Sequence, residues 1–181
     1  MRLAGLLRPK YPQSLGTSTN NWEDVFKKLE EPIPNLFRAI YSIVSGTERE
    51  IKEQALMDFI PGYRLIHISE FIEESTNLKN ILIDESLSDN EIVIPLLANY
   101  SSDYICYYKN SAGKELLCSL RNDSGELIVK HSSSEKFFET VCEFYKQGVY
   151  FLDSDGYLDY DMEKERTVGS LINYGITYWN E

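Results

Sequence analysis

Apolar residues recur at helical spacing in several short segments of the chain. One segment begins at Pro34 and carries an apolar stripe that ends at Gly46, where glycine can close a helix. Another spans 135–147 and begins after Ser132 or Ser134, either of which can cap it. The same spacing and capping signals predict further helices at 21–30, 47–56, 69–74 and 161–173.

Apolar runs in the middle of the chain predict β-strands. Residues 92–98 are nearly all apolar, which indicates a buried strand. Pro95 within this run favours an edge or a bulge, because proline cannot donate to the strand ladder. Beyond it, two turns with glycine separate three predicted strands, at 103–109, 115–120 and 127–131. A strand at 63–68 and a small hairpin over Asp155-Gly156 complete the set. Consecutive hairpins imply an antiparallel sheet rather than βαβ units.

These elements predict one α+β domain with a mixed, largely antiparallel β-sheet flanked by helices. The length of 181 residues is sufficient for a single buried core. Residues 1–21 are rich in Pro, Ser, Thr and Asn, which favours a flexible N-terminal lead-in. We therefore place the folded domain at 22–181.

The net charge of −11 narrows the kinds of partner that the chain suits. Residues 1–64 carry a net charge of +1, whereas 65–130 and 131–181 each carry −6. Nucleic acids and anionic membranes are disfavoured as partners, because phosphate binding needs a basic surface. The charge favours a basic protein partner, although solubility alone also explains many acidic chains.

Cysteine usage and the N-terminal residues bear on location. The cysteines are odd in number, and none has C-x-x-C spacing. They fall in predicted strands and in a helix, so we expect buried, reduced thiols and a cytoplasmic protein. The apolar stretch at 3–7 is too short for a signal peptide, and Arg8 interrupts it. The cysteines are Cys106, Cys118 and Cys142.

The residue pattern offers no catalytic or metal site. His67 and His131 lie in predicted strands, and neither has a second His or Cys at the spacing of a zinc site. No G-x-S-x-G elbow or other nucleophile context supports a histidine base. The acidic tract around Gly156 fails as an EF-hand, since Phe151 and Met162 would take the first and last ligand positions. We expect a protein that is not an enzyme and holds no metal or cofactor.

Several short segments occur in an order that matches a known family. They are Trp22-Glu23, Ile33-Pro34 with the helix after it, Gly46, the strand 92–96, Asp103-Tyr104-Ile105, and Ser134 to Phe144. In this order the chain resembles the SUKH superfamily, the Smi/Knr cell-wall-synthesis-regulator family. The resemblance implies one α+β domain without catalytic residues.

The resemblance also implies a function. Many bacterial members of that family look like immunity proteins, which neutralise nuclease or deaminase toxins by direct binding. It therefore implies a non-catalytic, cytoplasmic binding protein whose partner is a basic toxin domain. The alternative is a regulatory scaffold of the cell-wall (glucan) synthesis regulator type.

A partner-binding surface is predicted where acids and tyrosines are densest, because acids steer a basic partner and tyrosines add contact area. The alternative interpretation, without a binding role, is that these acids only solubilise a C-terminal helix. The residues predicted to bind the partner are Asp153, Asp155, Tyr157, Asp159, Tyr160 and Asp161, with Glu135 and Glu139.

Overall fold

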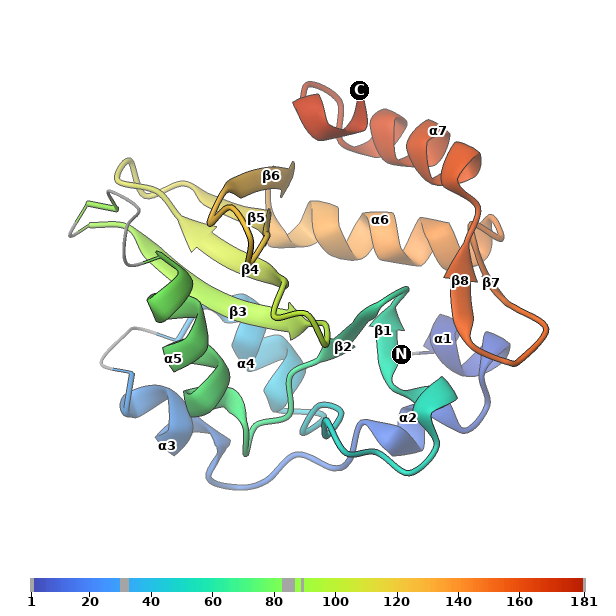
Figure 1. The fold of residues 1–181 in the computed structure, drawn as a ribbon, viewed down its shortest axis with the longest axis horizontal. Helices are drawn as coiled ribbons and strands as arrows, with labels where there is room; N and C mark the ends of the chain where they lie inside the picture. The colour runs from blue at the N-terminus through green and yellow to red at the C-terminus, as the bar shows by residue number, and fades with distance from the viewer. Residues whose placement is uncertain (1, 30–32, 83–86, 89, 181) are drawn as a thin grey trace.

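The computed structural model describes residues 2–29, 33–82, 87–88 and 90–180 (Figure 1). Within these residues the fold is α+β, with a six-stranded sheet, a separate two-stranded hairpin and flanking helices, which confirms the predicted class. The strands of the main sheet pair in chain order, and each of these pairings is antiparallel. The strands are β1 (Asp58–Ile60), β2 (Tyr63–Leu65), β3 (Ile92–Ala98), β4 (Tyr104–Lys109), β5 (Glu115–Leu120), β6 (Leu127–His131), β7 (Tyr150–Leu152) and β8 (Leu158–Tyr160).

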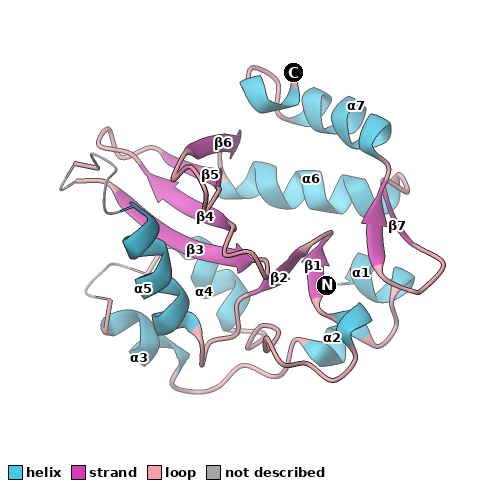
Figure 2. Cartoon of the chain, viewed as in Figure 1, coloured by secondary structure: helices cyan, strands magenta, loops and turns pink. Residues whose placement is uncertain are grey.

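Helices cover the sheet and extend the fold at both ends of the chain (Figure 2). The longest, α6, packs against β5 and β6 and also against α7, so it lies between the main sheet and the C-terminal helix. The α-helices are α1 (Arg2–Leu7), α2 (Tyr11–Ser14), α3 (Trp22–Lys27), α4 (Asn35–Tyr41), α5 (Phe71–Ile81), α6 (Ser134–Lys146) and α7 (Met162–Ile172), with 3₁₀ turns η1 (Gln54–Leu56) and η3 (Thr177–Trp179).

The predicted hairpins and the bulge at the proline are confirmed. Gly113 and Gly125, with φ angles of 79° and 69°, lie in the turns that join β4 to β5 and β5 to β6. The register of β3 against β4 shifts between Pro95 and Leu97, so Leu96 is an extra residue on the bulged strand. Aromatic contacts among α3, α4 and α5 supply part of the core, where the tilted rings of Phe26 and Phe71 have centroids 4.5 Å apart.

The N-terminal residues contradict the expected flexible lead-in. The helices α1 and α2 form, and they bury Tyr11 and Leu15 completely in the core. Arg8 is also buried; its guanidinium lies 4.0 Å from the centroid of the Tyr11 ring and donates to the Tyr145 hydroxyl at 3.0 Å. Composition suggested a lead-in, but contacts with distant parts of the chain order the segment.

Other local predictions differ for tertiary reasons. The helix predicted at 47–56 is wrong: the Thr47 backbone N–H donates to the Leu65 carbonyl at 2.9 Å, and only the turn η1 forms. The acidic helix predicted at 69–74 begins at Phe71 and continues through polar residues to Ile81. Ser133, rather than either serine beside it, caps α6 by accepting from the Lys136 N–H.

Two further boundaries differ from those that the sequence predicts. Helix α3 ends at Lys27, earlier than the predicted end at residue 30, which lies outside the described residues. His67 follows β2 instead of lying within it. The predicted small hairpin and C-terminal helix are confirmed as β7–β8 and α7.

Candidate partner-binding hairpin and apolar slot

The β7–β8 hairpin has one face toward the core and one toward solvent. Tyr150 and Leu158 are buried, and the Tyr150 ring packs edge-on against the Tyr145 ring at the C-terminal end of α6, 5.0 Å between centroids. Because strand side chains alternate, Phe151 and Asp159 point the other way; they are direct partners in the register, and both are exposed. The hairpin therefore presents an aromatic ring beside a carboxylate.

The predicted acids of the hairpin divide into two groups. Asp153 and Asp161 have structural roles: Asp153 Oδ1 accepts from the N–H groups of Asp155 and Tyr157 in the turn, and Asp161 Oδ1 caps α7 by accepting from the Lys164 N–H. This backbone hydrogen bond lowers the pKa of Asp161. Asp155 and Asp159 are exposed side chains, and they are the members of the set best placed to meet a partner.

Three apolar residues of this surface were missed by the sequence analysis. Phe151, Leu152 and Met162 are exposed on or beside the hairpin, with Met162 at 64%. Together with Tyr157, which is 47% exposed, they supply contact area next to the exposed acids Asp155 and Asp159. Strand alternation from the buried Tyr150 is the sequence signal that places Phe151 outward.

Glu135 and Glu139 do not join this surface. They lie on the first half of α6, whereas the hairpin packs at the other end of that helix (Figure 1). At a rise of 1.5 Å per residue, Glu135 and Tyr145 lie about 15 Å apart along the helix axis. Glu139 also pairs with Lys136 at 2.8 Å. These two acids thus form a separate part of the surface. Tyr160, by contrast, is in the hairpin but half-buried, and burial raises its pKa.

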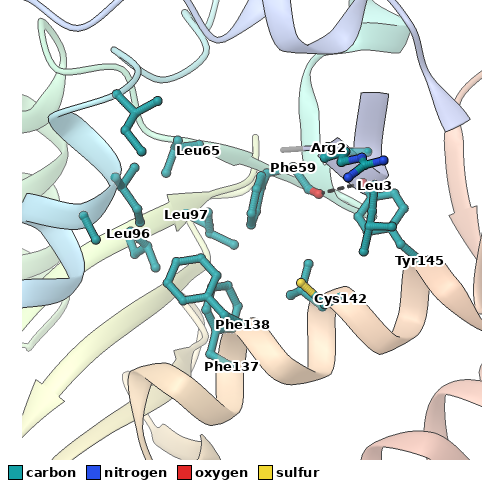
Figure 3. Close-up of a pocket in the computed structure, with 15 residues that line it drawn as sticks. Arg2, Leu3, Phe59, Leu65, Leu96, Leu97, Phe137, Phe138, Cys142 and Tyr145 are labelled. Carbon is teal, nitrogen blue, oxygen red and sulfur yellow. Dashed lines mark hydrogen bonds between the residues drawn. The ribbon is translucent and has the colours of Figure 1, made fainter. Parts of the chain in front are cut away.

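A second feature is an apolar slot of about 440 Å³ between α1, α4 and α6, with β1, β2 and β3 as its floor (Figure 3). The bulge in β3 directs both Leu96 and Leu97 into it, which regular alternation would prevent. Its walls include Ile43, which is 65% exposed, and Phe138. Cys142 also lines the slot and is exposed, so the expectation of three buried thiols is wrong at this position.

The histidines are held in structural contacts. The amide of Asn173 donates to the Thr140 hydroxyl at 2.9 Å and to the Gly169 carbonyl at 3.0 Å. Its oxygen therefore faces His131 Nδ1 at 3.0 Å and accepts the proton that this nitrogen carries. Burial lowers the pKa of His131 to about 4. His67 Nδ1 bonds to the Ser69 hydroxyl at 2.7 Å. In the described ranges, no group of three or more His, Cys, Asp or Glu side chains is arranged to hold a metal ion.

Comparison with known proteins identifies no family for this chain. No protein-family model matches the chain, and a search of curated proteins finds no match. Of the helices in the described ranges, none combines the length and apolar character needed to cross a membrane.

Proposed function

We propose that this chain is a non-catalytic protein-binding domain whose partner is basic, and that it acts as an immunity protein against a bacterial toxin of nuclease or deaminase type. The observation that carries the proposal is the outward face of β7–β8. There, Phe151 and Tyr157 lie exposed beside the exposed carboxylates of Asp155 and Asp159, although Asp159 Oδ1 also accepts from the Tyr160 N–H at 2.8 Å. The resemblance in segment order to the SUKH superfamily supports the choice of partner.

The physical basis is complementarity of charge and shape. Enzymes that act on nucleic acid carry basic clefts, and an acidic surface is attracted to them at long range and associates faster. Exposed aromatic rings then bury large areas at a small cost in side-chain entropy, which is why they dominate binding energies. An acid flanked by rings also suits the guanidinium of arginine, which pairs with carboxylates and stacks on aromatic faces.

A cytoplasmic location is part of the same proposal. The cysteines are free, and Cys106 and Cys118 are direct neighbours across β4 and β5. Buried thiols that remain reduced at such a position fit a reducing compartment. Burial also raises the pKa of the Cys118 thiol to about 12, which keeps it unreactive.

The test is association of the purified chain with the toxin domain encoded beside its gene. The double variant Asp155→Lys, Asp159→Lys should slow association on the order of tenfold or more and flatten its salt dependence, because like charges then oppose each other. The matched control is Glu135→Lys, Glu139→Lys, with the same charge change at the far end of α6. Equal slowing by both pairs would show general steering without a hairpin interface. No association with the toxin domain would reject the immunity proposal and favour a scaffold for another partner.

A further inference from the structure

The apolar slot is elongated, and the charged side chain of Arg2 lies at one end of it. In Figure 3, Arg2 and Tyr145 lie at one end of the slot and Leu96 at the other, with Phe59 and Leu97 between them. Of the described residues that line it, Arg2 alone carries a charge. A volume of about 440 Å³ falls within the roughly 300–1,000 Å³ that small-molecule sites occupy.

The interior of the slot offers almost no hydrogen-bonding group to a ligand. The Tyr145 hydroxyl is already used, since it donates to the Phe59 carbonyl at 3.2 Å and accepts from Arg8. A polar ligand group placed among the leucines and phenylalanines would lose its hydrogen bonds to water without replacement, which is strongly unfavourable. The occupant that matches is therefore hydrocarbon along the slot and polar only at the end near Arg2.

We propose that this slot binds a single-chain fatty acid, with the acyl chain along the floor of Leu96 and Leu97 and the carboxylate at the Arg2 guanidinium. Arginine binds carboxylates in a planar, two-bond geometry. A basic protein partner is a poorer match here, because Arg2 repels it. The slot thus differs in charge from the acidic hairpin, and the inference does not depend on the immunity function.

Ligand titration of the full chain tests the chemistry of the slot. Octanoate, decanoate, dodecanoate and tetradecanoate, each below its micelle concentration, are compared by calorimetry. Every two added methylenes should tighten binding on the order of tenfold until the slot is full. Dodecyltrimethylammonium, with the same chain but a cationic head, should bind at least tenfold more weakly than dodecanoate. Absence of saturable binding, or equal binding of the cation, would overturn the proposal.

Matched variants locate the site. Ala39→Trp adds bulk at an exposed alanine that lines the slot and should abolish dodecanoate binding, whereas Ala112→Trp, in the exposed β4–β5 turn, should leave it unchanged. Arg2→Glu should weaken dodecanoate at least tenfold, and Arg121→Glu, at an exposed arginine that is not among the lining residues, should not. Normal binding by the Ala39→Trp chain would place the ligand elsewhere. Binding to phosphatidylglycerol vesicles without binding of free dodecanoate would assign the slot to a membrane surface and reject the fatty acid.

Discussion

Arg64 and Glu74 form an ion pair in the interior of the protein, with Arg64 Nη2 2.6 Å from Glu74 Oε1. The two side chains are only 3% and 2% exposed. The pair is surrounded by further hydrogen bonds, since Arg64 Nη1 donates to the Thr47 carbonyl at 2.9 Å and the Tyr104 hydroxyl donates to Glu74 Oε2 at 2.8 Å. This cluster ties α5 to β2 and β4, and it holds the segment around residue 47 against the sheet.

The buried pair should make Glu74 the most sensitive acid of α5. We expect Glu74→Gln to lower the free energy of unfolding by about 1.5–3 kcal/mol, because buried Arg64 then loses one of its two carboxylate partners and keeps only Glu70, whose Oε2 lies 2.7 Å from Arg64 Nη2. Glu73→Gln, at the neighbouring exposed position, should change it by less than about 0.5 kcal/mol. Urea unfolding measures both, and equal losses would contradict the role of burial.

Gly46 should tolerate no side chain. Its φ of +94° is unfavourable for other residues, and a Cβ there would lie 2.3 Å from the Ile66 carbonyl oxygen. Gly62 has a φ of +78° but open space around it. We expect Gly62→Ala to cost about 1–2 kcal/mol from backbone strain alone. Gly46→Ala should cost several kcal/mol more, or prevent folding. Thermal unfolding of the two variants separates the cost of backbone strain, present in both, from the cost of the steric clash at Gly46. Similar melting temperatures would refute the close approach of Gly46 to Ile66.

His131 should make stability depend on pH. Its pKa is about 4 in the folded state because the ring is buried, against about 6.5 when unfolded. The unfolded state therefore binds the proton first, and stability falls as pH drops from about 6.5 to 4, by up to about 3 kcal/mol. His131→Gln should remove this part of the slope, while the lost packing lowers stability by a similar amount at every pH. Urea unfolding at several pH values measures the slope, and an unchanged slope would count against the buried, neutral ring.

The two kinds of hairpin acid should separate by mutation. Asp153→Ala removes an acceptor of two backbone N–H groups and should destabilise the hairpin by about 1 kcal/mol. Asp155→Ala, two residues away, removes an exposed carboxylate and should leave stability within about 0.5 kcal/mol. Hydrogen exchange of the hairpin amides reports the difference. Equal protection in both variants would remove the distinction between structural and partner-facing acids.

Much of the β-region followed from the sequence, because its signals are local. Glycine in a turn, alternation in a strand and a proline in an apolar run act on neighbouring residues, so the two hairpins, the bulge near Pro95 and the β7–β8 hairpin were predictable. Helix α6 was predictable for the same reason, apart from a one-residue shift of its cap to Ser133.

The candidate site was predictable only in part. The acids of the hairpin are visible in the sequence, but which of them hold the turn and the helix cap and which are exposed depends on the folded backbone. Composition also gave no sign that Glu135 and Glu139 lie on the first half of α6, away from the hairpin. Phe151 was passed over, although its position follows from the alternation that begins at Tyr150.

By itself the sequence determined the α+β class, the order of the hairpins and the excess of acid after residue 64. Only the tertiary structure decided the rest, since contacts between distant residues compete with local preference. Thr47 forms a β-bridge with Ile66 instead of joining the predicted helix. Burial of Tyr11 orders a segment whose composition suggests flexibility. A bulge directs Leu96 into the slot. Burial of apolar surface and backbone pairing outweigh the few tenths of a kcal/mol per residue that helix propensity contributes.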